Sequence, residues 1–248
     1  MKKIFLISGA ALALGFAGAS SAAALVGAPG AVGTLPGIYA GVGGGWGGMD
    51  TPKLTQTDLA NLSAASGTYK IHKGVSARGY LGYLWAIQQV QNLQLGAELG
   101  YNHYPKNKYT VTNANNVTES WNYKGYTIDL LGVAKYNFGN TGFNGLLKVG
   151  PAYVRQKLAV TPATGTPVML APSLGASKGK VKAELAGGLG YDINQNIDVN
   201  VIVAHVFGSK PASLGSNAGV PTKASVNKVA SVTTAMLSVA YHFGDLNM

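Results

Sequence analysis

Apolar and polar residues alternate along eight segments of the chain, each of which is about ten residues long. In the last segment, smaller or more polar residues separate Leu237, Val239, Tyr241 and Phe243 from one another. The segments span residues 37–46, 75–85, 93–103, 125–138, 145–156, 181–191, 197–207 and 229–243. A period of two predicts β-strands with one apolar face. A strand that crosses a membrane in a tilted barrel needs about 9–11 residues, so each segment is long enough to cross one.

The connections between these segments alternate in length. They contain 28, 7, 21, 6, 24, 5 and 21 residues in chain order. The short connections are turn-forming sequences such as "GNTGFN" and "DINQN", and the long ones are rich in Gly, Pro, Ser and Asn. Short turns on one rim and long loops on the other are typical of outer-membrane barrels, which also have an even number of strands.

The two faces of each segment differ in composition. In segment 93–103 one face is apolar and ends in Tyr101, whereas the other carries Gln94, Glu98 and Asn102, separated from one another by glycines. Glycine and alanine are frequent on the mixed faces, as a narrow lumen requires. We therefore predict that the apolar faces meet lipid and the mixed faces line the lumen. A barrel must close on itself because no strand edge can stay unpaired in lipid.

Aromatic residues mark both ends of the predicted lipid-facing surface. At the short-turn rim they are Tyr83, Trp85, Tyr136, Phe138, Tyr191, Tyr241 and Phe243. At the long-loop rim they are Trp46, Tyr101, Tyr126, Tyr153 and Phe207. Amphipathic rings prefer the two membrane–water interfaces, so these sets predict two belts.

The amino-terminal sequence predicts export. Lys2 and Lys3 precede an apolar run that ends in small residues, which is the layout of a secretory signal peptide with cleavage near Ala23 or Ala24. We expect four regions. They are a signal peptide (1–24), an N-terminal tail (25–36), an all-β, eight-stranded antiparallel up-and-down transmembrane barrel (37–243) and a short C-terminal extension (244–248).

Composition agrees with this organisation. Charged residues make up 11% of the chain, against about 25% in ordinary soluble domains. The chain contains 35 glycines and no cysteine, which excludes disulfides, thiolate metal sites and a lipid-anchored cysteine.

The predicted long loops are strongly basic. They carry thirteen basic residues: Lys53, Lys70, Lys73, Lys106, Lys108, Lys124, Arg155, Lys157, Lys178, Lys180, Lys210, Lys223 and Lys228. Their acids are Asp50, Asp58 and Glu119. Positive charge at this rim would meet the anionic sugar-phosphate layer of lipopolysaccharide. A solvated basic surface without a specific ligand is the alternative. Export and the absence of a recognition motif argue against nucleic acid as a partner, and the sequence does not identify a loop ligand.

Several charged residues fall on lumen positions: Arg78, Glu98, Asp129, Glu184 and Lys182. Charges in a narrow lumen need partners. We expect Arg78 to bind two or more of the carboxylates, and Lys135 and Lys148 to lie nearer the periplasm beside Asp198. A purely structural role and a gated ion path through a switchable salt bridge are both open.

No enzyme chemistry is evident. The four histidines, His72, His103, His205 and His242, have neither metal-ligand nor nucleophile spacing. A lipid-modifying site near the outer rim would need residues such as His103, Ser120 and Asp50, which form no motif. The glycine run "GVGGGWGG" is not followed by a helix that could bind phosphate. We expect no cofactor, no metal and no catalysis.

The segments "GIYAGVGGGW", "GAELGY" and "GGLGYDI" resemble the small surface barrels of the outer-membrane protein A and opacity-protein type. The alternating last strand, with Leu237, Val239, Tyr241 and Phe243, resembles the terminal signal that the barrel-assembly machinery reads. The resemblance covers residues 37–243 and lacks the family's peptidoglycan-binding domain. It implies a surface-exposed structural or antigenic protein of the bacterial outer membrane. A small porin and an adhesin that binds host or matrix ligands are the alternatives. Pro151 predicts a bulge within its strand.

Overall fold

The computed structural model describes residues 33–49, 74–87, 89–90, 92–112, 118–161, 175–209, 215–217, 220–223 and 229–244. The predicted signal peptide (1–24), most of the predicted tail and the last four residues lie outside these ranges. The same holds for several of the loop lysines.

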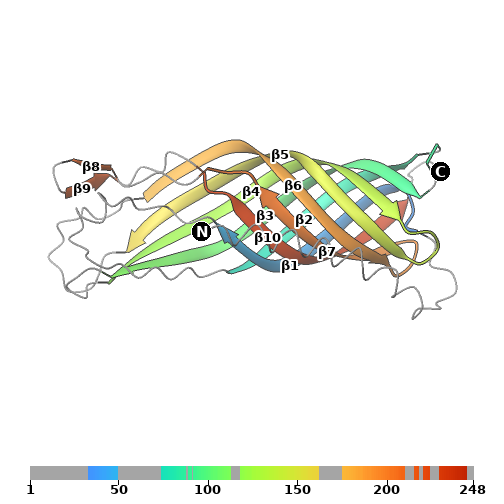
Figure 1. Ribbon diagram of the computed structural model, residues 1–248, viewed down its shortest axis with the longest axis horizontal. Helices are drawn as coiled ribbons and strands as arrows, with labels where there is room; N and C mark the ends of the chain where they lie inside the picture. Colours follow the sequence, from blue (N-terminus) through green and yellow to red (C-terminus); the bar gives the residue numbers. More distant parts are fainter. Residues whose placement is uncertain are drawn as a thin grey trace.

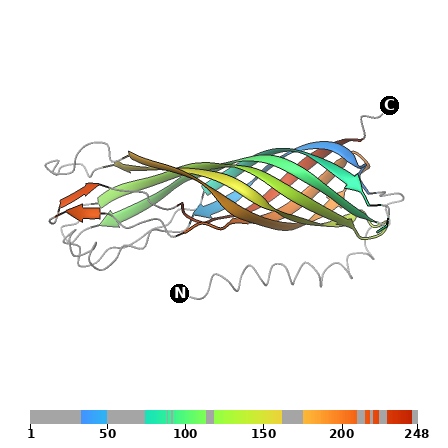
Figure 2. The same ribbon diagram turned by 90° about the horizontal axis from the view of Figure 1, so that it is seen from above.

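Eight antiparallel strands form one closed barrel. They are β1 (Gly37–Met49), β2 (Gly74–Ala86), β3 (Leu93–Thr112), β4 (Thr118–Asn137), β5 (Phe143–Thr161), β6 (Gly175–Asp192), β7 (Ile197–Val206) and β10 (Val232–Gly244). Each strand pairs with its neighbours in sequence, and β10 pairs with β1 to close the ring (Figures 1 and 2). β8 (Gly215–Asn217) and β9 (Val220–Lys223) form a separate two-stranded sheet. The predicted fold class is confirmed. Among the described residues, no helix has the length and apolarity needed to cross a membrane.

Several strands are longer than the sequence pattern predicts. β3 and β4 have 20 residues each, and β5 and β6 have 19 and 18. They project beyond the other strands at the end opposite the short turns (Figure 1). Eight of the basic residues predicted in the loops lie on strands: Lys106, Lys108, Lys124, Arg155, Lys157, Lys178, Lys180 and Lys223. The alternation rule missed these extensions because they face water on both sides and need no apolar face.

Two smaller predictions are wrong. β10 begins at Val232, because residues 229–230 turn inward and are buried. Pro151 produces no bulge: Asp129 pairs with Ala152 and Gly132 with Val149, so the register between β4 and β5 is the same on both sides. Pro151 interrupts the ladder because it has no N–H to donate, but it adds no residue.

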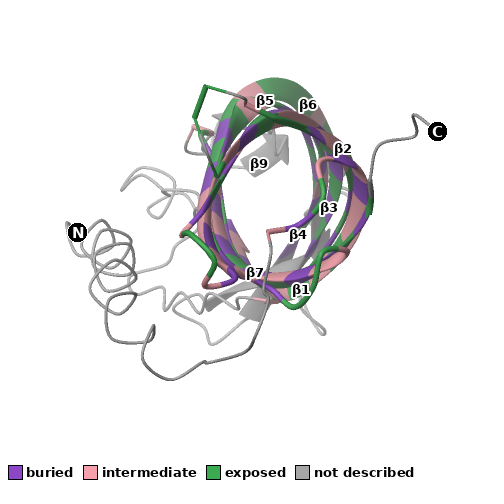
Figure 3. Ribbon diagram, turned by 90° about the vertical axis from the view of Figure 1, so that its right-hand side faces the viewer, coloured by how far each residue is buried: buried purple, intermediate pink, exposed green. Residues whose placement is uncertain are grey.

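Every strand presents an exposed aliphatic residue near its middle, with between 43% and 68% of its surface accessible. These residues are Val42, Leu81, Leu99, Leu130, Val149, Leu185, Val201 and Val239. Buried residues alternate with them along the strands of the closed ring (Figure 3). Because successive side chains of a strand point to opposite faces, the buried ones face the inside of the ring. A continuous apolar band around a protein exceeds the isolated patches that soluble proteins tolerate. The exposed band therefore faces lipid.

The aromatic residues of the short-turn rim form ring pairs on this outer wall. Tyr83 lies beside Trp85 and Tyr136 beside Phe138, with ring centroids 4.9 Å and 5.6 Å apart. Tyr241 lies 4.9 Å from Phe243. At the other rim, Tyr101 on β3 contacts Tyr126 on β4, and Phe207 contacts His205.

The β1–β10 contact tests the inside–outside assignment. A Cβ atom at Gly45 would collide with the carbonyl oxygen of Ala235 on β10, whereas a Cβ atom at Gly44 would meet nothing within 4 Å. We expect Gly45→Ala to lower the yield of folded, heat-modifiable barrel and its thermal stability, because β1 and β10 would have to separate. Gly44→Ala should leave both unchanged. Equal effects of the two substitutions on electrophoretic mobility and melting temperature would contradict this assignment.

Candidate functional site in the barrel lumen

The inside of the barrel holds two charged clusters. Arg78 on β2 is at the centre of the upper cluster, the one farther from the short turns. Its guanidinium donates to both carboxylate oxygens of Asp129 on β4 and to Glu98 Oε1 on β3, each at 2.8 Å. The side chains of these residues have at most 5% of their surface accessible. Such planar, two-point hydrogen bonds between charged groups are shorter and stronger than neutral ones.

Glu98 receives two further donors from other strands. Lys148 Nζ on β5 donates to Glu98 Oε2 at 2.6 Å, and the Tyr39 hydroxyl on β1 donates to the same oxygen at 2.8 Å. The Lys148 ammonium also lies 4.9 Å from the centre of the Tyr80 ring. Glu98 is fully buried, so these donors replace the water that its charge loses on folding.

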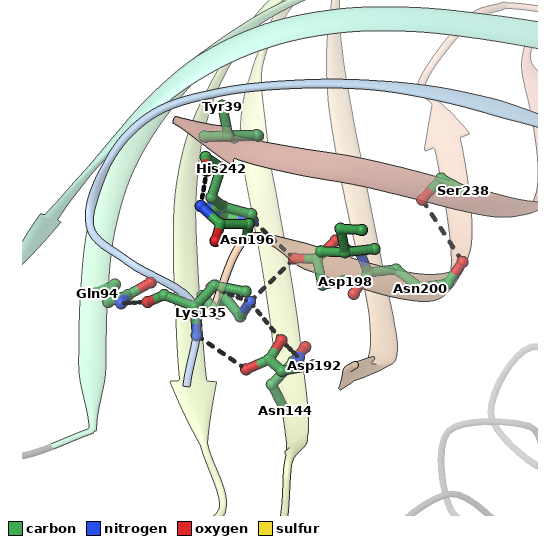
Figure 4. Close-up of polar contacts among 12 residues, drawn as sticks. Tyr39, Gln94, Lys135, Asn144, Asp192, Asn196, Asp198, Asn200, Ser238 and His242 are labelled. Carbon is green, nitrogen blue, oxygen red and sulfur yellow. Dashed lines mark hydrogen bonds and ion pairs between the residues drawn. The ribbon is translucent and has the colours of Figure 1, made fainter. Parts of the chain in front are cut away.

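The second cluster lies nearer the short turns and is drawn in Figure 4. Lys135 on β4 donates to Asp192 on β6 at 2.8 Å and to Asp198 on β7 at 2.9 Å. His242 Nε2 on β10 lies 3.0 Å from the same Asp198. The ring of Tyr39 stacks on His242, with centroids 5.3 Å apart. Since Tyr39 also binds Glu98, it connects the two clusters.

The segment just before β1 covers this lower cluster. Thr34 is 2% exposed, and its hydroxyl accepts a hydrogen bond from Lys135 Nζ at 2.7 Å. The Thr34 carbonyl accepts from Gln94 on β3 at 2.9 Å, and its amide donates to Asp192 at 3.3 Å. The next amide, of Leu35, donates to the carbonyl of Gln195 at 2.9 Å. Residues 33–35 therefore cross the mouth of the barrel at the short-turn end, and we call them the strap.

The segment just before β10 covers the other mouth. The side-chain amide of Gln156 on β5 accepts a hydrogen bond from the Ala230 N–H at 3.0 Å and donates to the Ala230 carbonyl at 3.2 Å. Val229 and Ala230 are buried. Because β5 and β10 are not neighbours in the ring, this contact reaches across the lumen.

Residues 36–246 match the OmpA-like transmembrane domain family. The chain belongs to this family. An uncharacterized protein of Coxiella burnetii is 30% identical over 192 residues, which are 69% of this chain and 75% of that protein. Two solved structures align with most of the chain. Outer membrane protein OprG of Pseudomonas aeruginosa has 15% identity and a TM-score of 0.48, covering 86% of this chain and 98% of its own. Neisserial surface protein A has 13% identity and a TM-score of 0.46, covering 83% and 97%.

As an OmpA-like transmembrane barrel, the protein lies in the bacterial outer membrane. In such barrels the short turns face the periplasm and the long loops face outward. The strap thus lies at the periplasmic mouth, and the projecting parts of β3–β6 lie at the outer rim.

The structure brings together some of the predicted lumen residues and not others. Arg78 binds Glu98 and Asp129, but Glu184 lies outside this hydrogen-bonded group: it is 2% exposed, and its Oε2 has no partner among the described residues. Lys182 is half-buried and takes part in no ion pair of the described residues.

Lys135 and Lys148, both predicted to lie beside Asp198, belong to different clusters. Lys135 binds Asp198 as expected, but Lys148 binds Glu98 instead. Lys148 lies opposite Val133, whereas Lys135 lies opposite Leu146, so Lys148 is two positions farther from the short turns. At about 3.4 Å per residue, this height brings Lys148 to the Arg78 cluster.

Sequence reasoning missed Tyr39, Asp192, His242 and Thr34 as members of the site. Tyr39 and His242 alternate with lipid-facing residues, so their positions in the strand pattern could have identified them as facing the lumen. Asp192 begins a turn sequence, and Thr34 precedes the first strand, so no periodicity marks either one as buried.

Only one of the residues considered for an enzyme site has a described side chain. His103 is exposed on the outer wall, while Asp50 and the side chain of Ser120 lie outside the described residues. In the part of the chain that the structure describes, no group of three His, Asp or Glu side chains is placed to hold a metal ion.

The strap can be tested with cysteine labelling, because the chain contains no cysteine of its own. We expect Thr34→Cys in the folded barrel to react with a maleimide at least about tenfold more slowly than Leu35→Cys, since reaction at position 34 requires local opening. The side chain of Leu35 is 36% exposed and serves as the matched control.

Adding Lys135→Met should accelerate labelling at position 34 and leave position 35 unchanged, because it removes a donor that holds the strap. Equal labelling rates at the two positions without Lys135→Met would show that residues 33–35 do not cover the mouth.

Proposed function

We propose that this protein is a closed barrel that anchors outward-projecting strands in the outer membrane and serves as a surface-exposed structural or antigenic protein. The observation that carries the proposal is the ion network across the lumen. Its two clusters draw side chains from all eight strands, with Tyr39 between them. A lumen crossed by such a network is poorly suited to steady solute flow.

Apolar and aromatic side chains also point into the lumen. Tyr80, Leu131, Val133, Ile202 and Met236 all point inward and are at most 7% exposed. Eight strands enclose an interior that side chains can just fill, whereas open aqueous channels usually have about 16 strands. The strap and residues 229–230 add cover at the two mouths. These features together support a structural barrel.

The projecting strands supply the surface that the barrel would display. β3 continues past Tyr101 of the outer aromatic belt to Thr112, and β5 continues past Tyr153 to Thr161. An adhesin would use the same surface, so this feature supports that alternative as well.

One observation favours the porin alternative. Glu184 is a buried carboxylate without a hydrogen bond to its Oε2, so the lumen has an uncompensated polar group. Buried charges of this kind attract water or cations. A small, gated cation path through a rearranged Arg78 cluster is therefore the second candidate function.

Conductance in planar lipid bilayers distinguishes the two candidates. We expect the wild-type barrel to give only small, infrequent current steps. Arg78→Ala leaves Glu98 and Asp129 with surplus negative charge, which should draw in water and cations and raise cation conductance. Lys182→Ala removes a cation that pairs with none of the described acids and serves as the control. Large, steady openings of the wild type would defeat the closed-barrel proposal and support the porin.

We also propose that the last strand carries the signal for the barrel-assembly machinery. Leu237, Val239, Tyr241 and Phe243 share the lipid-facing side of β10, with exposures of 56%, 44%, 48% and 56%. We expect Phe243→Ala to reduce the amount of assembled barrel in cells. Phe207→Ala, which removes a 50% exposed ring at the opposite rim, should have a smaller effect. Deleting residues 244–248 should be neutral or beneficial.

Cell fractionation and unboiled gel electrophoresis measure this effect. If the deletion abolishes assembly while Phe243→Ala has no effect, the end of the signal has been assigned to the wrong residues.

A further inference from the structure

Three basic side chains stand together on the outer wall of β4 and β5, just above the outer aromatic belt. Lys124 lies on β4, and Arg155 and Lys157 lie on β5, and all three are exposed. In the barrel's register, Lys124 is directly opposite Lys157, and Tyr126 is directly opposite Arg155. Directly opposite residues of an antiparallel pair share a face, so all four side chains point to the same side of the sheet.

The pairing of Lys124 with Lys157 is unfavourable by itself. Their Cβ atoms are neighbours at about 4.5–5.5 Å, and like charges in this position destabilise a sheet. No acid relieves them within the described part of the chain. All five acids with described side chains, Glu98, Asp129, Glu184, Asp192 and Asp198, are buried in the lumen. Among the described side chains, this part of the outer wall therefore carries positive charge without a compensating acid.

The height of the three residues fixes what they can meet. Tyr126 and Tyr153 belong to the aromatic belt, which lies at the level of the lipid headgroups. Lys124 lies two residues beyond Tyr126, and Arg155 and Lys157 lie two and four residues beyond Tyr153. At about 3.4 Å per residue along strands tilted by roughly 35–45°, they stand about 5–11 Å above the belt.

The belt also orients Arg155. Arg155 lies directly opposite Tyr126 on the neighbouring strand, so the two side chains are neighbours on the same face of the sheet. Across the next pairing, Arg155 lies opposite Gly179 on β6, where the absence of a Cβ leaves room for the Tyr153 hydroxyl. The guanidinium is therefore held beside aromatic rings at the membrane surface.

We propose that Lys124, Arg155 and Lys157 form a binding site for a phosphate group of the outer-leaflet glycolipid. A phosphate between Lys124 and Lys157 neutralises both ammonium groups, and the planar Arg155 guanidinium offers it two further donors. The acyl chains of the same lipid then lie along the exposed aliphatic residues below the belt. The site does not depend on whether the lumen conducts ions, so it stands apart from the proposed closed barrel.

Lipid binding by the folded, detergent-solubilised chain tests the site. The variant Lys124→Gln/Lys157→Gln should bind lipid A with two phosphates about tenfold more weakly than the wild type. The control variant is Lys178→Gln/Lys180→Gln. It removes the same charge from the same projecting sheet, but these lysines lie opposite Gln156 and Val154, whose side chains face the lumen.

The control should change the affinity by less than about twofold, because its lysines lie on the other face of the sheet and do not contact the bound phosphate. Attraction by net charge alone would instead weaken both double variants equally. Heat-modifiable mobility establishes that both variants are folded. Wild-type binding should fall for dephosphorylated lipid A and should be weaker for phosphatidylglycerol vesicles.

Three results would overturn the proposal. They are an unchanged affinity of the Lys124/Lys157 variant, equal losses in the two double variants, and equal wild-type binding of lipid A and phosphatidylglycerol. The second result would mean that net charge alone attracts the lipid. The third would mean that the basic residues bind any anionic lipid surface.

Discussion

The carboxylate of Glu98 determines how the inside of this barrel is organised. A charge that is wholly buried in a narrow lumen must recover from protein groups the hydrogen bonds it loses from water. Glu98 does so with Arg78, Lys148 and Tyr39, which come from three other strands. Through the ring of Tyr39 the network continues to His242, and from there to Asp198 and the strap. The outer wall needs only apolar residues, so the specific contacts lie inside.

The fold was predictable because lipid imposes a simple rule on each strand. Outward residues must be apolar, every backbone group must pair, and the connections of an outer-membrane barrel alternate in length. Leu99 and Leu130 therefore face outward, and Glu98 and Asp129 face inward, as the alternation predicts. The rule stops at the membrane surface. Beyond Tyr101 and Tyr153, water lies on both sides of the sheet, so neither the extra length of β3–β6 nor the start of β10 could be read from periodicity.

The lumen was predictable only in part. Parity identifies Arg78, Glu98 and Asp129 as inward, and their opposite charges imply pairing. Parity says nothing about which partner is within reach, since this depends on the stagger between strands. For this reason Lys148 binds Glu98 and not Asp198, and Glu184 lies outside the hydrogen-bonded group around Arg78. Thr34 contributes through its backbone and hydroxyl, and a single threonine before a strand carries no such signal in sequence.

A double-mutant cycle on Arg78 and Asp129 tests the central claim, that buried ion pairs hold the lumen together. The quantity is the free energy of unfolding in lipid vesicles, measured for Arg78→Met, Asp129→Asn and the double variant. Removing one partner of a buried pair leaves an unpaired charge and costs roughly 3–5 kcal/mol. The double variant should therefore be destabilised by less than the sum of the single variants, with a coupling energy of about 1–3 kcal/mol. Additive effects, or single substitutions that leave stability unchanged, would contradict the account.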